Sequence, residues 1–356
     1  RWVFYMLTKY SSLTNPSTYI SIGILLGVIA LLTGCQPHQS LPSALDEYQT
    51  RIHRVLAIPE QPTNIGITLN YPEASQRSIT IPGTIMPLAE FYAISGCELA
   101  PLIAQRNTAL GKVEYPSRRL VYESTLLHTL TNCIKLVAAK GMTSTDANAA
   151  LFDTLKVKQI YYPKTWANVI QNSPSMRLGL GFSPGYIEGD ASDGFVETKA
   201  ALQYLYQAHL IPPLNITQLE AQLDVLESFR LPARLYRSTQ LITLKLGQLN
   251  QLLTDYNAGF TCGNPIIKEQ IKILNNVMKQ FFIQTLQPIA SHINHYQREL
   301  TPILDDIMAS PEIHPSMRAY LNTQAQSFVA YQAVFTEHVT QLQQVLASCG
   351  LRPTAN

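Results

Sequence analysis

Apolar side chains recur every three or four positions along most of this chain, which is the spacing of one face of an α-helix. The clearest case runs from Ser117 to Lys140, with Pro116 just before it and Gly141 just after it. Proline suits the first turn of a helix, and glycine suits its C-terminal cap. The pattern predicts a mainly α-helical fold, in the form of an elongated helical bundle.

The same periodicity predicts further helices, separated by turn signals. Asn264 can cap a helix that begins at Pro265, and Pro288 is expected to kink it. The last helix carries an apolar residue every seven positions, which is typical of a bundle seam; these residues are Leu321, Phe328, Phe335 and Leu342. The predicted helices cover residues 45–57, 87–105, 117–140, 145–155, 196–209, 217–228, 232–256, 265–299 and 316–347.

Three stretches interrupt the helical pattern. Residues 65–71 and 78–81 alternate apolar and polar side chains, so we expect a short irregular or β-like segment there, either extended or a small hairpin. Residues 171–195 are rich in Gly, Ser and Pro and are expected to form a polar loop. We therefore predict a single helical domain over residues 45–356. Its possible sub-blocks, joined by the loop, are residues 45–170 and 196–349.

The N-terminal part has the pattern of a lipoprotein signal peptide. An uncharged run from Tyr19 to Leu32 is about as long as a signal-peptide core and shorter than the roughly 20 residues of a membrane span. It ends in Leu-Thr-Gly-Cys, which resembles a lipobox, so residues 1–34 are the predicted signal, Cys35 the lipidation site and residues 35–44 a tether. Gln36, in place of Asp, favours the outer membrane. Met6 is the expected start.

Composition and charge bear on which kinds of partner the chain is expected to have. The chain has a net charge of +2 without long runs of one sign, which gives no indication of nucleic-acid binding. Only 14% of its residues are charged, and amides and hydroxyls supply much of the polar surface instead. No residue pattern predicts a cofactor. The membrane, reached through the lipid, is the first expected partner.

Four cysteines remain besides Cys35, and they allow three pairings. Disulfides are expected in an oxidising compartment such as the periplasm. We favour Cys97–Cys133 and Cys262–Cys349, because each pair brackets one block of helices. Four free buried thiols are the alternative, and a zinc site is less favoured because no two cysteines are closely spaced.

Two groups of polar residues outside the predicted loop are candidate sites. His292, His295 and Glu299 share one helix face, as weak metal-ligand candidates, although a solvated polar face explains them better. Arg106 and Asn107 stand between two predicted helices. We interpret them as a structural corner, with a ligand contact as the alternative.

Two motifs lie inside the predicted loop. Residues 181–185 match the G-x-S-x-G nucleophile elbow, but Pro184 lacks the N–H that an oxyanion hole requires, so a turn is favoured. Glu188, Asp190 and Asp193 loosely resemble a calcium loop without its register, and a mobile acidic loop is the simpler interpretation.

The stretch from Cys97 to Cys133 and its flanking residues carry a family resemblance. The matching segments are Cys97–Leu99, Ile103–Asn107, Leu110–Val113, Ser117–Leu120, Tyr122–Glu123 and Asn132–Ile134, together with Tyr48–Leu56. They resemble the proteobacterial lipoproteins grouped as domain of unknown function 3080. Thr108 and Glu114 depart from the family pattern. The resemblance implies a class and a location but no catalytic residue.

We predict an outer-membrane-anchored periplasmic lipoprotein that binds or scaffolds an envelope protein partner and is not an enzyme. The alternative is an envelope enzyme or ligand-binding protein that acts on peptidoglycan or lipid through residues 171–195. A deep pocket where Glu188, Asp190 and Arg106 converge would favour the alternative. An exposed apolar patch would favour the protein partner.

Overall fold

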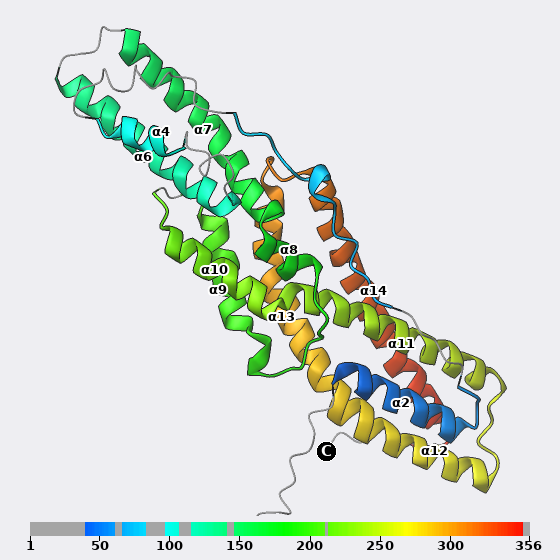
Figure 1. Cartoon of the computed structure of the whole chain (residues 1–356). Coiled ribbons are helices and arrows are strands. Elements are labelled where there is room, and N and C mark those ends of the chain that lie inside the picture. Colours follow the sequence, from blue (N-terminus) through cyan, green and yellow to red (C-terminus); the bar gives the residue numbers. More distant parts are fainter. Residues whose placement is uncertain are drawn as a thin grey trace, which may run out of the picture. The chain divides into compact units, whose positions relative to one another are not determined.

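The computed structural model describes residues 40–60, 66–82, 97–106, 115–140, 146–210 and 213–351, all within one compact unit that begins at Ser40 (Figure 1). These residues form helices and connecting segments without a β-strand, which confirms the mainly α fold. The longer elements are α2 (Leu41–Leu56), α4 (Leu99–Arg106), α6 (Pro116–Ala139), α7 (Asp146–Asn172), α8 (Pro174–Gly181), α9 (Phe195–Gln207), α10 (Ile216–Phe229), α11 (Leu231–Gly259), α12 (Pro265–Val277), η3 (Met278–Leu286), α13 (Gln287–Ala309) and α14 (Pro315–Ser348).

The first helix starts earlier than predicted. α2 begins at Leu41, so the predicted tether to residue 44 was wrong at its end. Pro42 lies in the first turn, where its missing N–H costs no hydrogen bond. Leu41 and Ala44 are buried against the core, and this burial favours helix over an extended tether.

The predicted β-like segment has no strand pairing in its described residues, 66–82, and is irregular apart from the 3-10 turn η1 (Ala74–Gln76). Side chains of α7 take the place of a neighbouring strand. Asn168 accepts a hydrogen bond from the backbone N–H of Ile79 at 2.9 Å and donates one to its carbonyl at 2.7 Å. Arg77 donates to the carbonyls of Pro72 and Gln171. The segment therefore satisfies its backbone groups on a helix surface instead of in a hairpin.

The loop predicted over residues 171–195 is mostly helical. α7 continues to Asn172, and α8 follows at once, capped by Ser173, whose hydroxyl accepts from the N–H of Met176. The glycine content misled the prediction. A Cβ at Gly179 would lie 3.1 Å from the carbonyl oxygen of Leu226, so glycine there permits close helix packing between α8 and α10. Only residues 182–190 are irregular before the short turn η2 (Ala191–Asp193).

Two internal prolines do not end their helices. α7 runs through Pro163, although the predicted helix ended at residue 155, because Tyr162, Trp166 and Ile170 bury one continuous face. α12 passes into α13 through η3, a π-helix that ends just before Pro288, the expected kink. The wider π turn accommodates the disturbance that proline causes in a helix.

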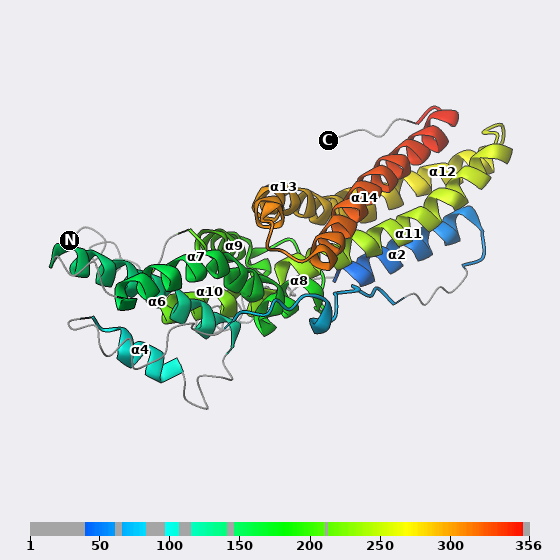
Figure 2. The ribbon, with the colours of Figure 1, turned by 90° about the horizontal axis from the view of Figure 1, so that it is seen from above.

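Two cores hold the helices together. The larger lies around α11 and α14, which pack along their length, with α2 and α12 beside them (Figures 1 and 2). Along the predicted seven-residue seam of α14, Leu321 and Leu342 are buried, and Phe328 and Phe335 are half-buried against the core. The smaller core lies where α4 packs on α6, as Figure 2 shows.

Both predicted disulfides form. Cys97 and Cys133 join the start of α4 to α6 with a Cα–Cα distance of 5.4 Å, and Cys262 and Cys349 join the ends of α11 and α14 at 5.2 Å. Each bridge lies in or beside one of the two cores.

Candidate functional site

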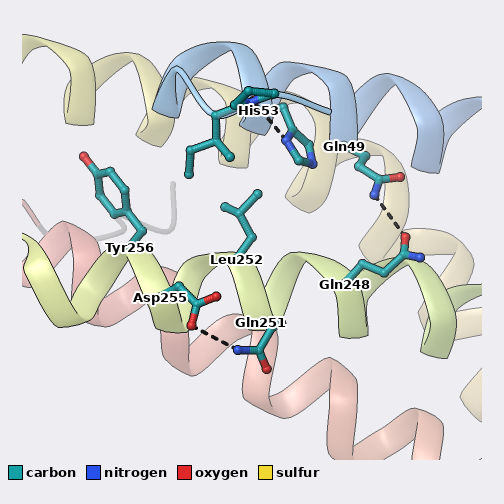
Figure 3. Close-up of a pocket in the computed structure, with 9 residues that line it drawn as sticks. Gln49, His53, Gln248, Gln251, Leu252, Asp255 and Tyr256 are labelled. Atoms are coloured by element: carbon teal, nitrogen blue, oxygen red, sulfur yellow. Dashed lines mark hydrogen bonds between the residues drawn. The ribbon is translucent and has the colours of Figure 1, made fainter. Parts of the chain in front are cut away.

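A cleft of about 730 Å³ lies between the C-terminal halves of α2 and α11 (Figure 3). This volume lies in the range of small-molecule sites. In Figure 3, Gln49 and Gln248 meet across the cleft, Tyr256 stands at the other end and Leu252 points between them. The lining residues are Gln49, His53, Ile58, Pro59, Gln248, Gln251, Leu252, Asp255 and Tyr256.

The end of α2 shapes one wall. Ala57 adopts a left-handed conformation (φ 56°), which turns the chain so that Ile58 and Pro59 fold over the cleft. His53 lies in the last turn, and its Nδ1–H donates to the carbonyl oxygen of Ile58 at 3.2 Å. This bond fixes the ring and leaves Nε2 as the acceptor of the neutral imidazole.

A chain of polar groups orients the glutamine pair at the opposite end. Lys245 forms an ion pair with Asp46 at 2.8 Å and donates to Oε1 of Gln49 at 3.1 Å. Because Oε1 of Gln49 accepts, its Nε2 amide group donates to Oε1 of Gln248, also at 3.1 Å. The two amides are therefore held in one orientation before any ligand arrives.

The remaining rim is polar and partly aromatic. Gln251 donates to the carboxylate of Asp255 at 3.0 Å, one helical turn away. Tyr256 stacks on Phe260 with ring centroids 5.0 Å apart, and partial burial raises the pKa of its phenol. Tyr256 is therefore an uncharged hydroxyl at neutral pH, able to donate and to accept.

The cleft is suited to binding by its chemistry. Its apolar surface comes from Ile58, Pro59 and Leu252, and its polar groups are mostly amides. The arrangement can hold a ligand that offers several neutral hydrogen-bonding groups beside an apolar face.

A sequence model of the family described as Protein of unknown function (DUF3080) matches residues 45–353, which is most of the chain. The chain belongs to the DUF3080 family. No match was found among curated proteins or among solved structures. In the described part of this DUF3080 member, no helix is both long and apolar enough to span a membrane.

The candidate metal ligands of this DUF3080 member do not form a metal site. Glu299 pairs with Lys199 at 2.7 Å, and the hydrogen bond from Lys199 lowers the pKa of its carboxyl. His295 packs on Phe195 with ring centroids 4.9 Å apart. Over the described ranges, no group of three or more His, Cys, Asp or Glu residues is arranged to hold a metal ion.

The acidic residues before α9 do not form a mobile acidic loop as expected. Asp193 is fully buried, and its carboxylate accepts from the backbone N–H groups of Glu188 and Gly189 at 3.1 and 2.9 Å. It also pairs with Arg234 at 2.6 Å and accepts from the hydroxyl of Tyr296 at 3.2 Å. Asp193 therefore holds the turn that contains Glu188 and Gly189 against α11, through Arg234, and against α13, through Tyr296.

The other sequence candidates have no catalytic arrangement. Ser183 is buried, and its hydroxyl accepts from the N–H of Gly185, which makes residues 181–185 a turn. Arg106 is the last residue of α4, which packs on α6, whereas Glu188 and Asp190 lie in the turn fixed by Asp193. Asn107 and Cys35 lie outside the described residues, so the corner and the lipid anchor stay predictions.

Sequence reasoning missed a buried histidine on α14. His338 is fully buried; its Nε2 accepts from the hydroxyl of Tyr48 and its Nδ1–H donates to Oδ1 of Asn250, both at 2.8 Å. Asn250 in turn donates to the carbonyl of Val334 at 3.0 Å, which settles its amide orientation. This network ties α2, α11 and α14 together. Its signal in the sequence is weak, because nothing marks one histidine among apolar residues as buried.

Proposed function

We propose that this chain is a non-enzymatic binding lipoprotein of the cell envelope that takes its ligand in the cleft between α2 and α11. Acyl chains on Cys35 hold it to the periplasmic face of the outer membrane. The lipobox-like sequence before Cys35 and the residue Gln36 support the location. The two disulfides of the structure agree with an oxidising compartment.

The observation that carries the binding role is the cleft with its pre-oriented amides. Gln49 and Gln248 are aligned by Lys245, and Gln251, Asp255 and Tyr256 continue the polar rim. Planar amides and an uncharged phenol match ligands rich in amide and hydroxyl groups, such as N-acetylated sugars and their attached peptides. Pre-orientation lowers the ordering cost of binding.

The binding role can be tested with soluble N-acetylglucosaminyl–N-acetylmuramyl peptides and the purified, acylated full chain. We expect isothermal titration to give saturable binding that weakens at least about tenfold in Tyr256→Ala, because a hydroxyl and an aromatic face are lost. Gln332→Ala on the exposed face of α14 is the matched control and should bind like the parent protein. No saturable binding, or equal weakening in both variants, would overturn the proposal for this cleft.

A second candidate function, docking of an envelope protein, is favoured by an apolar stripe on α12. Ile266 and Ile273 are seven residues apart on one helix, and their side chains are 77% and 49% exposed. A photocrosslinker at Ile273 in intact cells should capture a defined envelope protein. Gln332, exposed on α14 and outside the cleft lining, is the control position. Identical capture from both positions, or from neither, would exclude a partner on α12.

The lipid anchor has its own test. Cys35→Ala removes the thiol that would take up diacylglycerol, so we expect loss of acyl labelling and release from the outer-membrane fraction. Cys35→Ser offers a control for side-chain size and should behave in the same way. Persistent palmitate labelling of either variant would show that Cys35 is not the lipidation site.

A further inference from the structure

A second groove, of about 460 Å³, lies between α6 and α7 and is closed on one side by His209, just after α9. It shares no residue with the cleft between α2 and α11. Its lining residues are Leu127, His128, Thr131, Asn132, Lys135, Gln159, Tyr162, Pro163 and His209. Leu127, Tyr162 and Pro163 provide an apolar wall, and the others are polar.

The polar part of this groove offers one cation and several hydrogen-bonding groups without a carboxylate. Lys135 is exposed, and among the described residues no carboxylate lies within ion-pair distance of its ammonium group. His128 and His209 add two imidazoles, and Asn132 and Gln159 add two amides. Charge-assisted hydrogen bonds from such groups favour an anionic ligand.

The surrounding helices strengthen this positive potential. Residues 116–172 contain seven Lys or Arg residues and three Asp or Glu residues, in a chain whose net charge is only +2. One of the three acids, Glu123, is buried and already paired with Lys158 at 3.0 Å and with Arg119 at 2.5 Å. The charged residues of this stretch are therefore predominantly basic.

Neighbouring contacts hold the imidazole and phenol groups of the groove in place. The ring of His209 packs on Trp166 with centroids 4.6 Å apart, and its Nδ1–H donates to the carbonyl of Tyr206. Nε2 is the nitrogen left to meet a ligand, and in this tautomer it accepts a hydrogen bond from the hydroxyl of a monoprotonated phosphate. Tyr162 donates its hydroxyl to the carbonyl of Ala208 at 2.8 Å, and burial raises its pKa, so it adds no negative charge.

We infer that this groove binds a phosphate group, with Lys135 as the main charge partner and His128, His209, Asn132 and Gln159 as hydrogen-bonding groups. A phosphate presents several oxygen acceptors to donors that approach from two helices and a turn. The wall of Leu127, Tyr162 and Pro163 then accommodates the organic part of the ligand. The same chemistry serves a free phosphate ester or a phospholipid headgroup.

The site can be tested by following the histidine ring signals of the acylated full chain in detergent by NMR. The probes are inorganic phosphate, glycerol 3-phosphate and dihexanoyl phosphatidylglycerol, each compared with chloride at equal ionic strength. We expect saturable shifts of the His128 and His209 signals. Tighter binding of glycerol 3-phosphate would indicate a free ester as the ligand source, and tighter binding of the lipid would indicate a headgroup.

A pair of lysine variants separates a built site from general charge attraction. Lys135→Gln removes the ammonium of the groove and should weaken binding about tenfold. Lys164→Gln on α7 removes an equal charge that lies over the ring of Tyr161, outside the groove lining, and should weaken binding less than twofold. Equal weakening in both variants, or shifts no larger than those in chloride, would overturn the inference. Neither outcome bears on the cleft between α2 and α11.

Discussion

At the residue scale, His338 shows how a buried polar group fixes the register of helices. Its two ring nitrogens are satisfied by Tyr48 and Asn250, which come from α2 and α11. A network of this kind is stable only when every member has its partner, because an unsatisfied buried group costs more than the hydrogen bond contributes. The network therefore selects one alignment of α2, α11 and α14 among many that would bury similar apolar area.

The same residue predicts acid sensitivity. Burial lowers the pKa of His338 to about 3 in the folded chain, against 6.5 for an ordinary histidine. As the pH falls below 6.5, the imidazole of His338 binds a proton in the unfolded chain but stays neutral in the folded chain. This difference reduces the unfolding free energy by up to about 1.4 kcal/mol per pH unit, until the pH approaches 3. Urea denaturation at pH 7, 6, 5 and 4 measures this slope.

A variant isolates the contribution of His338 from that of other acid-sensitive groups. His338→Gln can hydrogen-bond but cannot titrate, so its unfolding free energy should fall less steeply with acid, although it starts lower at pH 7. His128→Gln, at an exposed position, is the control and should keep the parent slope. Equal slopes in all three proteins would contradict the prediction.

At the element scale, glycines have opposite roles that depend on what surrounds them. Gly194 joins η2 to α9 with φ +66°, and a Cβ there would lie 2.1 Å from the ring of Phe229. Gly247 lies inside α11, and a Cβ there would have no neighbour within 4 Å. The sequence shows a glycine in both cases, but only the packing around it distinguishes a required glycine from a tolerated one.

This difference predicts substitutions of opposite sign. Gly194→Ala forces a left-handed alanine against an aromatic ring and should lower the unfolding free energy by roughly 1–3 kcal/mol. Gly247→Ala should raise it by about 0.5–1 kcal/mol, because alanine restricts the unfolded chain and favours helix. Chemical denaturation of the two variants beside the parent protein checks both signs. A stabilised Gly194→Ala would contradict the packing seen here.

At the scale of the whole described unit, the disulfides support two different cores. Cys262–Cys349 spans a sequence separation of 87 residues and ties the ends of α11 and α14, the central helix pair. Cys97–Cys133 spans 36 residues and ties α4 to the smaller core. In the chain-entropy account, the longer loop gives the larger constraint on the unfolded chain.

We therefore expect the two bridges to differ in what they protect. The double variant Cys262→Ala/Cys349→Ala should lower the global unfolding free energy by roughly 2–5 kcal/mol. The double variant Cys97→Ala/Cys133→Ala should instead release α4 first, seen as early proteolysis near residues 97–106 with a smaller change in the global transition. Identical global losses in both double variants would argue against two separable cores.

The sequence alone determined the helical class and most helix boundaries, and it favoured the two cysteine pairs that form. These features depend on local periodicity, caps such as Asn264, and the spacing of a few cysteines. The prediction from sequence was wrong where one local pattern is compatible with two different structures. The glycines of residues 171–195 indicated a loop but permit helix contact. The helix predicted to end at residue 155 continues through Pro163 to Asn172, because its packed face continues.

The tertiary structure decided which residues share a site. The cleft joins residues about 200 positions apart, such as Gln49 and Gln248, and the phosphate-binding groove adds His209 to two earlier helices. Likewise Asp193 became a buried anchor only through Arg234 and Tyr296. Periodicity shows which face of each helix is buried, but not which helix covers it. That choice depends on complementary packing and satisfied polar groups between distant segments, which exist only in the folded chain.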